Sequence, residues 1–164
     1  MTRSRRRPTE MSFIFQDCEI VNNAGLWRPF QRAAFMPRRV AVWATYWLDA
    51  RRHGRNADGW RRSSLLIHAM NGILVFAIAQ DLLPFSAAVM TAGLFLSHPL
   101  TTMASCYVAG RSASLSTMVQ LLAAIAALHG FFLVALILVG AATWWVKEDS
   151  AAGIFLIGIV WLLG

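Results

Sequence analysis

The chain has 164 residues, of which 57% are hydrophobic and 14% charged, and its formal net charge is +7. Soluble domains carry about 25% charged residues, so the composition excludes an ordinary soluble domain and favours a single unit whose apolar surface faces lipid or other helices. Cys18 and Cys106 lie far apart without CxxC or Cys/His spacing, so neither a disulfide framework nor a zinc site is predicted.

The first residues form a basic arm. Arg3, Arg5, Arg6 and Arg7 resemble the charged start of a signal peptide, but the apolar stretch that follows, residues 11–15, is too short for the hydrophobic region of a secretory or twin-arginine signal. We therefore expect this arm to lie on anionic lipid or on the acidic surface of a protein partner.

Residues 37–49 have the pattern of an amphipathic helix. Val40, Trp43 and Trp47 recur at i, i+3 and i+7. Four arginines flank them: Arg38, Arg39, Arg51 and Arg52. The pattern predicts a helix in the membrane interface with its tryptophans at headgroup level. A short helix buried in the membrane is the alternative, and the four arginines disfavour it.

The rest of the chain predicts consecutive membrane spans. They cover residues 64–83, 84–103, 113–129 and 131–146, with residues 151–163 as a short fifth. The first is 20 residues long, the length that crosses a hydrocarbon core of about 30 Å. Pro84 is expected to begin the second span, because proline is tolerated in a first helical turn, and His98-Pro99 to break it. Glycines inside these spans, at Gly72, Gly93 and Gly140, predict close helix packing.

The predicted fold class is therefore an all-α integral membrane protein. Residues 1–62 form the basic arm and interfacial helix, and residues 63–164 form a bundle of four to five transmembrane helices. No cofactor and no metal are expected. His68 and His98 are best explained as histidines hydrogen-bonded between helices, and ligation of a haem or chlorophyll is the alternative.

Positive charge is concentrated on one side of the predicted bundle. Thirteen of the fifteen Lys and Arg residues lie in residues 1–62, and the other two are Arg111 and Lys147. Alternating the spans through a bilayer puts all fifteen on one face, which the positive-inside rule makes cytoplasmic. The expected partners are anionic headgroups and other membrane protein subunits, since no nucleic-acid recognition motif accompanies the charge. The predicted docking residues are Arg5, Arg6, Arg7, Arg38, Arg39, Trp43 and Trp47.

Six short strings recur in a recognisable order. They are FQDCEIVNN (15–23), LD (48–49), GWRRSSLLIHAMN (59–71), LFLSHPL (94–100), YVAGRSASLSTM (107–118) and KEDSA (147–151). In this order they resemble the N-terminal part of the transmembrane-and-tetratricopeptide-repeat family, GT-C-type glycosyltransferases that use a lipid-phosphate-linked sugar. The resemblance covers roughly residues 12–160.

The resemblance implies candidate site residues. Asp17 and Glu19 would be the catalytic carboxylates if the chain is an enzyme. Arg111 and Lys147 would bind a lipid phosphate through charge-assisted hydrogen bonds. From the residues alone, the two acids are solvated or paired with nearby arginines, and Arg111 anchors a helix at the membrane interface. Both interpretations stay open.

Departures from the family pattern favour a non-catalytic role. Cys18, Met36, Arg61 and Ser64 replace an aspartate, an arginine, a histidine and an asparagine, and only MSFIF stands where the family has a transmembrane helix before its acidic pair. The later spans and repeats of the family have no counterpart either, and a site without its enclosing helices does not exclude water or fix reacting groups. We expect a non-catalytic, GT-C-derived membrane subunit that packs against a larger complex. The alternative is a glycosyltransferase, or a fragment of one, that uses a lipid-phosphate-linked sugar donor.

Overall fold

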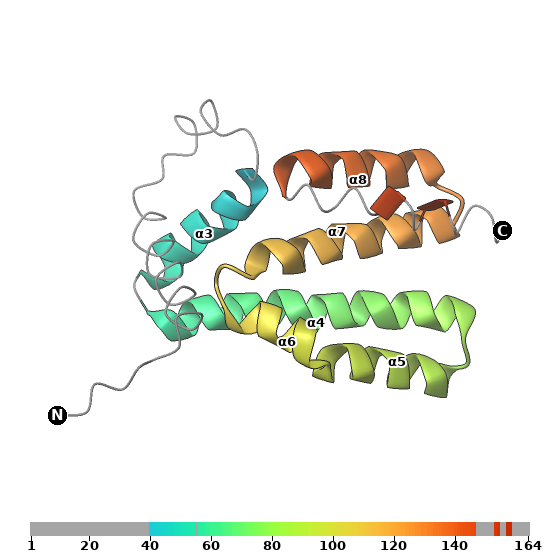
Figure 1. The fold of residues 1–164 in the computed structure, drawn as a ribbon, viewed down its shortest axis with the longest axis horizontal. Helices are drawn as coiled ribbons and strands as arrows, with labels where there is room; N and C mark the ends of the chain where they lie inside the picture. Colours follow the sequence, from blue (N-terminus) through green and yellow to red (C-terminus); the bar gives the residue numbers. More distant parts are fainter. Residues whose placement is uncertain (1–39, 55, 147–152, 155–156, 159–164) are drawn as a thin grey trace, which may run out of the picture.

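The computed structural model describes residues 40–54, 56–146, 153–154 and 157–158, and all regular structure in them is helical (Figure 1). The helices are α3 (Val40–His53), α4 (Ala57–Leu82), α5 (Phe85–Ser97), α6 (Pro99–Cys106), α7 (Arg111–Leu128) and α8 (Phe132–Trp145). The all-α prediction is thus confirmed for the described residues, and α3 lies where the amphipathic helix was predicted.

Local sequence explains where α4, α5 and α6 begin and end. The side chain of Asn56 caps α4 by accepting a hydrogen bond from the backbone N–H of Asp58 at 3.1 Å. Pro84 is the N-cap residue of α5, one residue before the helix that it was predicted to begin. His98 has an extended backbone, as residues before proline do, and Pro99 then opens α6. The predicted second span is therefore divided into two helices.

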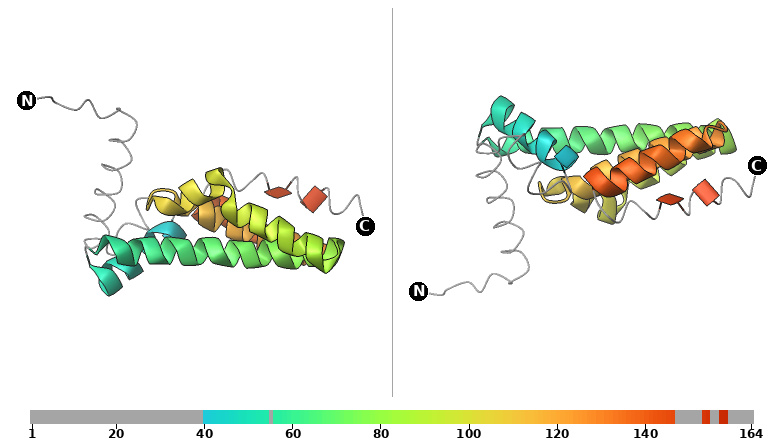
Figure 2. Two further views of the ribbon diagram at one scale, coloured as in Figure 1. Left: turned by 90° about the horizontal axis from the view of Figure 1, so that it is seen from below. Right: turned by 90° about the horizontal axis from the view of Figure 1, so that it is seen from above.

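Two antiparallel hairpins make up the bundle. The first pairs α4 with α5 and α6, the second pairs α7 with α8, and α4 lies against α7 (Figures 1 and 2). Gly130 makes the second turn possible, since its φ of 82° lies in the left-handed region that favours glycine. Its N–H bonds to the Ala127 carbonyl at 3.0 Å and that of Phe131 to the Ala126 carbonyl at 2.8 Å, the Schellman pattern of a helix end.

The described residues contain two helices long and apolar enough to cross a membrane, α4 with 26 residues and α7 with 18. The apolar helices α5 and α8 have only 13 and 14 residues. The predicted spans at 64–83 and 113–129 thus correspond to candidate spans, whereas the count of four to five stays a prediction. Of residues 151–163, only four are described; they have helical backbone, and Ile157 is buried against α7 and α8.

Small and polar residues are buried in the bundle, and large apolar residues are exposed. Alanines fill the contacts between paired helices, including Ala88, Ala92, Ala127 and Ala135. Asp49, Asn71 and Arg111 are buried as well. Exposed large apolar side chains lie outside: Leu65, Leu66, Met70 and Ile73 on α4; Phe85, Val89, Met90 and Leu94 on α5; Leu133, Leu136, Ile137 and Trp145 on α8. A water-soluble bundle has the opposite arrangement.

Glycines inside the helices were predicted to mark close helix packing. The structure confirms this for Gly72 and does not confirm it for Gly93 or Gly140. A Cβ at Gly72 would lie 2.5 Å from Cδ2 of Leu96 on α5, whereas a Cβ at Gly93 or Gly140 would meet nothing within 4 Å. We expect Gly72→Leu to lower the stability of the bundle by about 1–3 kcal/mol, the usual cost of overpacking. Thermal unfolding in detergent measures this, with Gly93→Leu as the matched control. Equal melting temperatures for the two variants would contradict the contact.

Candidate functional site

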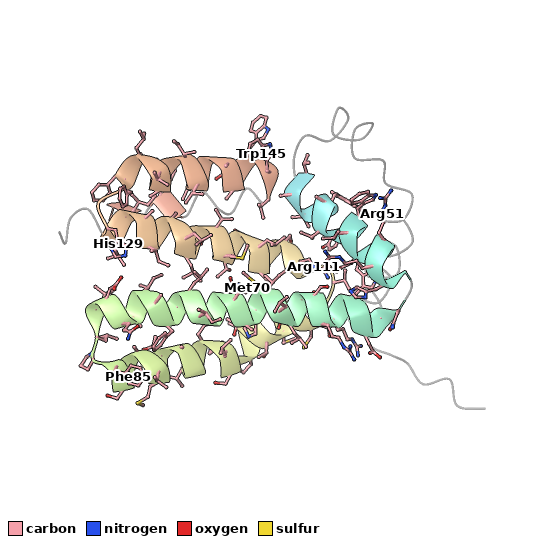
Figure 3. All side chains as sticks on the ribbon, turned by 180° about the vertical axis from the view of Figure 1, so that it is seen from behind. Arg51, Met70, Phe85, Arg111, His129 and Trp145 are labelled. Atoms are coloured by element: carbon pink, nitrogen blue, oxygen red, sulfur yellow. The ribbon has the colours of Figure 1, made fainter. Side chains whose placement is uncertain are left out.

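Arg111, the first residue of α7, lies at the centre of the end of the bundle where α3, α4 and α7 meet (Figure 3). Its side chain is 1% exposed, although arginine is almost never fully buried unless it is paired. The guanidinium contacts two residues one turn apart on α4. Nη2 donates to the Trp60 carbonyl at 3.0 Å and to Ser64 Oγ at 3.1 Å, and Nε donates to Ser64 Oγ at 3.3 Å.

Asp49 on α3 supplies the counter-ion. Its Oδ2 lies 2.6 Å from Arg111 Nη1, and its side chain is 6% exposed. Oδ1 accepts a hydrogen bond from Ser63 Oγ at 2.8 Å, whereas Oδ2 receives no further hydrogen bond from the described residues. The charge of Asp49 is therefore balanced by Arg111, and the pair joins α3 to α7 across α4.

Two aromatic rings enclose the guanidinium. Cζ of Arg111 lies 5.1 Å from the ring centroid of Tyr46 and 5.7 Å from that of Trp60, within the range of cation–π contacts. Each ring is fixed by a hydrogen bond of its own. Tyr46 donates to the Val108 carbonyl at 2.8 Å, and Trp60 Nε1 donates to the Gly54 carbonyl at 3.0 Å. The loop before α7 and the turn between α3 and α4 are thereby tied to the same site.

This arrangement can hold three helices in register. Isolated buried charges are unfavourable, so the Arg111–Asp49 pair stabilises the fold only while both partners stay in contact. One positive and one negative group leave no net charge in the site. In this structure, the geometry serves helix packing, because each of the guanidinium nitrogens already contacts an acceptor.

The structure places Arg111 away from a surface where a lipid phosphate could reach it. Asp49 on α3 already contacts Nη1 of Arg111, so a phosphate that bound Nη1 would have to displace Asp49. The phosphate role stays a prediction. Its expected partner Lys147 lies outside the described residues, as do Asp17, Glu19, Arg5, Arg6, Arg7, Arg38 and Arg39.

Trp43 and Trp47, the predicted docking residues of α3, are both partly exposed. The Trp43 ring packs edge-on to Tyr46, with ring centroids 5.7 Å apart, so it contributes to the core at this end of the bundle. The Trp47 ring is covered by the guanidinium of Arg51, whose Cζ lies 4.2 Å from its centroid. An aromatic ring under an exposed arginine fits the predicted interfacial position, which remains untested.

The two histidines have different surroundings. Nε2 of His68 lies 3.2 Å from the Leu96 carbonyl, which links α4 to α5 as the interpretation of a helix-bridging histidine requires. For His98 the same interpretation is wrong: it is exposed, and its Nδ1 accepts from the Leu100 backbone N–H at 3.3 Å to cap α6. No three His, Cys, Asp or Glu residues within the described ranges lie close enough together to hold a metal ion. Pigment ligation is not tested by these contacts.

Sequence reasoning did not predict the partners of Arg111. Asp49 was recognised only as an acid in a short aromatic helix, and it was not predicted to pair with Arg111. No contact with Arg111 was predicted for Tyr46, Trp60 or Ser64. One signal was present: an acid on an otherwise apolar helix and an arginine at the start of a span are each unfavourable in a membrane unless they pair.

No protein-family model, no curated protein and no solved structure matches the chain. The resemblance to transmembrane-and-tetratricopeptide-repeat glycosyltransferases thus remains a prediction based on the six strings.

Proposed function

We propose that this chain is a non-catalytic, multi-pass membrane subunit that packs against a larger membrane protein complex. The observation that carries the proposal is the distribution of polarity, with a charged pair inside the bundle and large apolar side chains outside it. Leu133 on α8 is 73% exposed and Leu94 on α5 is 68% exposed. Apolar faces of this extent need lipid or protein to cover them.

The proposal assigns four spans to the described helices. In addition to α4 and α7, it places α8 and the broken α5–α6 pair in the bilayer. The 14 residues of α8 extend only about 21 Å as a helix, less than the hydrocarbon core of about 30 Å. Such a short span is accommodated by local thinning of the bilayer or by association with other helices. The length of α8 therefore supports a subunit with neighbours.

The shared motif residues also support a structural role. Asp49, His68 and Arg111 belong to the strings that resemble the glycosyltransferase family, and each contacts another helix. Gly140 supports it in a second way. It is exposed on α8, with nothing within 4 Å of the position of a Cβ. Small residues on a span allow a partner helix to approach closely.

The two ends of the bundle differ in charge, which sets the proposed orientation. Exposed arginines gather at the α3 end: Arg51, Arg52, Arg61 and Arg62. At the opposite end Asp81 lies 3.6 Å from Nε2 of His129, and the described turns there contain no Lys or Arg. By the positive-inside rule the α3 end is cytoplasmic.

Thiol labelling of intact cells tests this placement. Cys106, exposed at the α3 end, serves as one probe in a Cys18→Ser background. The other is Leu83→Cys, at the turn between α4 and α5, in a chain with both native cysteines replaced by serine. A membrane-impermeant maleimide is expected to label Leu83→Cys in intact cells and Cys106 only after permeabilisation.

Labelling of Cys106 alone in intact cells would reverse the orientation. It would put the basic end outside, the side on which the family's transferases act. Labelling of both positions without permeabilisation would contradict the membrane crossing itself.

A further inference from the structure

A second polar region lies about halfway along the bundle, away from Arg111. It is a pocket of about 180 Å³ where α4, α5, α6 and α7 converge beneath the break at His98-Pro99. Its lining is His68, Asn71, Phe95, Leu100, Thr101, Ala113, Ser114 and Thr117. Asn71 lies 14 residues after the first residue of α4 and 11 before the last, so the pocket falls in the middle of the proposed span.

The polar groups of the pocket direct their hydrogen-bond donors at backbone carbonyls. Asn71 Nδ2 donates to Ser114 at 2.9 Å, Thr101 Oγ1 donates to Phe95 at 2.6 Å, and Thr117 Oγ1 donates to Ala113 at 3.0 Å. Nε2 of His68 likewise faces a backbone carbonyl, that of Leu96, at 3.2 Å.

One buried acceptor in the pocket is left without a donor. Asn71 is 2% exposed, and its Oδ1 is buried without a hydrogen-bond partner among the described residues. The threonine hydroxyl oxygens keep lone pairs. A buried acceptor without a donor is unfavourable, so the pocket calls for a ligand that donates.

The charge of the lining residues and the volume of the pocket restrict the chemical class of the ligand further. None of the lining residues is Asp, Glu, Lys or Arg, so neither an anion nor a cation would find a counter-ion. A water occupies about 30 Å³ in the liquid, and drug-sized ligands need about 300 Å³ or more. The pocket therefore fits a small neutral head with the first carbons of a chain. Leu100 on its rim is 74% exposed, so the rest of a chain can lie on the apolar outer face.

We propose that this pocket binds the hydroxyl head of a neutral, long-chain lipid alcohol from within the bilayer. The hydroxyl donates to Asn71 Oδ1, and the chain leaves past Leu100. This proposal rests on the membrane location proposed above and adds a ligand class to it.

Photoaffinity labelling in phosphatidylcholine vesicles tests it. The probe is a hexadecanol that carries a diazirine near the hydroxyl and a terminal alkyne, compared with the matched fatty acid and the matched hydrocarbon. We expect the alcohol to label peptides of α6 and the first half of α7 about tenfold more than the hydrocarbon does, the ratio that one good hydrogen bond provides.

Three variants report on the pocket and one is a control. Ala113→Leu fills the pocket without removing a hydrogen bond, Asn71→Leu removes the unpartnered acceptor, and Thr117→Val removes a hydroxyl at constant size. Ala69→Leu, on an exposed position of α4, is the matched control. Ala113→Leu and Asn71→Leu should abolish the alcohol preference, Thr117→Val should reduce it, and Ala69→Leu should leave it unchanged. If Asn71→Leu does not fold, Ala113→Leu and Thr117→Val still show whether the alcohol binds in the pocket.

The outcomes separate the two proposals. Equal labelling of the pocket by alcohol and hydrocarbon, or by alcohol and fatty acid, overturns the proposed ligand class. An alcohol preference that survives Ala113→Leu overturns the proposed site. If the hydrocarbon labels the outer face of α8 but the alcohol does not label the pocket, only the pocket proposal fails. If the hydrocarbon labels no outer face, the membrane location fails.

Discussion

Arg111→Leu is expected to lower the stability of the bundle by about 3–5 kcal/mol, the usual effect of breaking a buried ion pair from one side. The substitution leaves Asp49, 4% exposed, without its counter-ion and without any hydrogen bond to Oδ2 from the described residues. It also removes both contacts to Ser64. Thermal or denaturant unfolding of the purified protein in detergent measures the change.

A double-mutant cycle shows whether the pair is the cause. Replacing both Asp49 and Arg111 by leucine removes both charges, so its cost should be smaller than the sum of the two single substitutions. Arg52→Leu, an exposed arginine on α3, is the matched control and should change stability by no more than about 0.5 kcal/mol. If Arg111→Leu is as mild as Arg52→Leu, the buried ion pair does not form.

Trp60→Ala should have an effect of similar size. Trp60 is 1% exposed and packs against Tyr46, with ring centroids 6.1 Å apart, where α3 meets α4. Truncating a buried tryptophan costs about 3–5 kcal/mol. Loss of its Nε1 bond to the Gly54 carbonyl should also loosen α3, which limited proteolysis after Arg51 or Arg52 detects.

The control for this substitution is an exposed tryptophan. Trp145 at the end of α8 is 53% exposed, so Trp145→Ala removes the same side chain from a position outside the core (Figure 3). Its melting temperature in detergent should stay near that of the unaltered protein. If Trp60→Ala and Trp145→Ala lower the melting temperature equally, the packing of Trp60 does not stabilise α3.

The helices were largely predictable because their signals are local. Apolar runs, Pro84 and His98-Pro99 each act within a few residues, and the structure has helix boundaries at both prolines. The break of residues 84–103 into two helices was predictable for the same reason, because Pro99 favours an extended backbone at His98. The number of membrane spans stays a prediction, because two of the described helices are long and apolar enough to cross a membrane.

The site was harder to predict because its partners are distant in sequence. Asp49 and Arg111 belong to different regions of the chain, and only the packing of α3 across α4 and α7 brings them together. Glycine shows the same limit. Gly72, Gly93 and Gly140 look alike in sequence, yet only Gly72 has a neighbouring helix within contact distance. Local patterns predict which residues are helical, and they do not predict which faces meet.

Native mass spectrometry of the protein, extracted in mild detergent from the membranes that normally contain it, tests the central proposal most directly. We predict a particle in which the 18.2 kDa chain is bound to at least one other membrane protein in a fixed ratio. A side chain at Gly140 or Gly93 would meet nothing within 4 Å, so Gly140→Leu and Gly93→Leu should each leave the bundle folded. If α8 is the docking face, Gly140→Leu should reduce the association. If α5 is the docking face, Gly93→Leu should reduce it. The chain alone, accompanied only by lipids in all three forms, would contradict its role as a subunit.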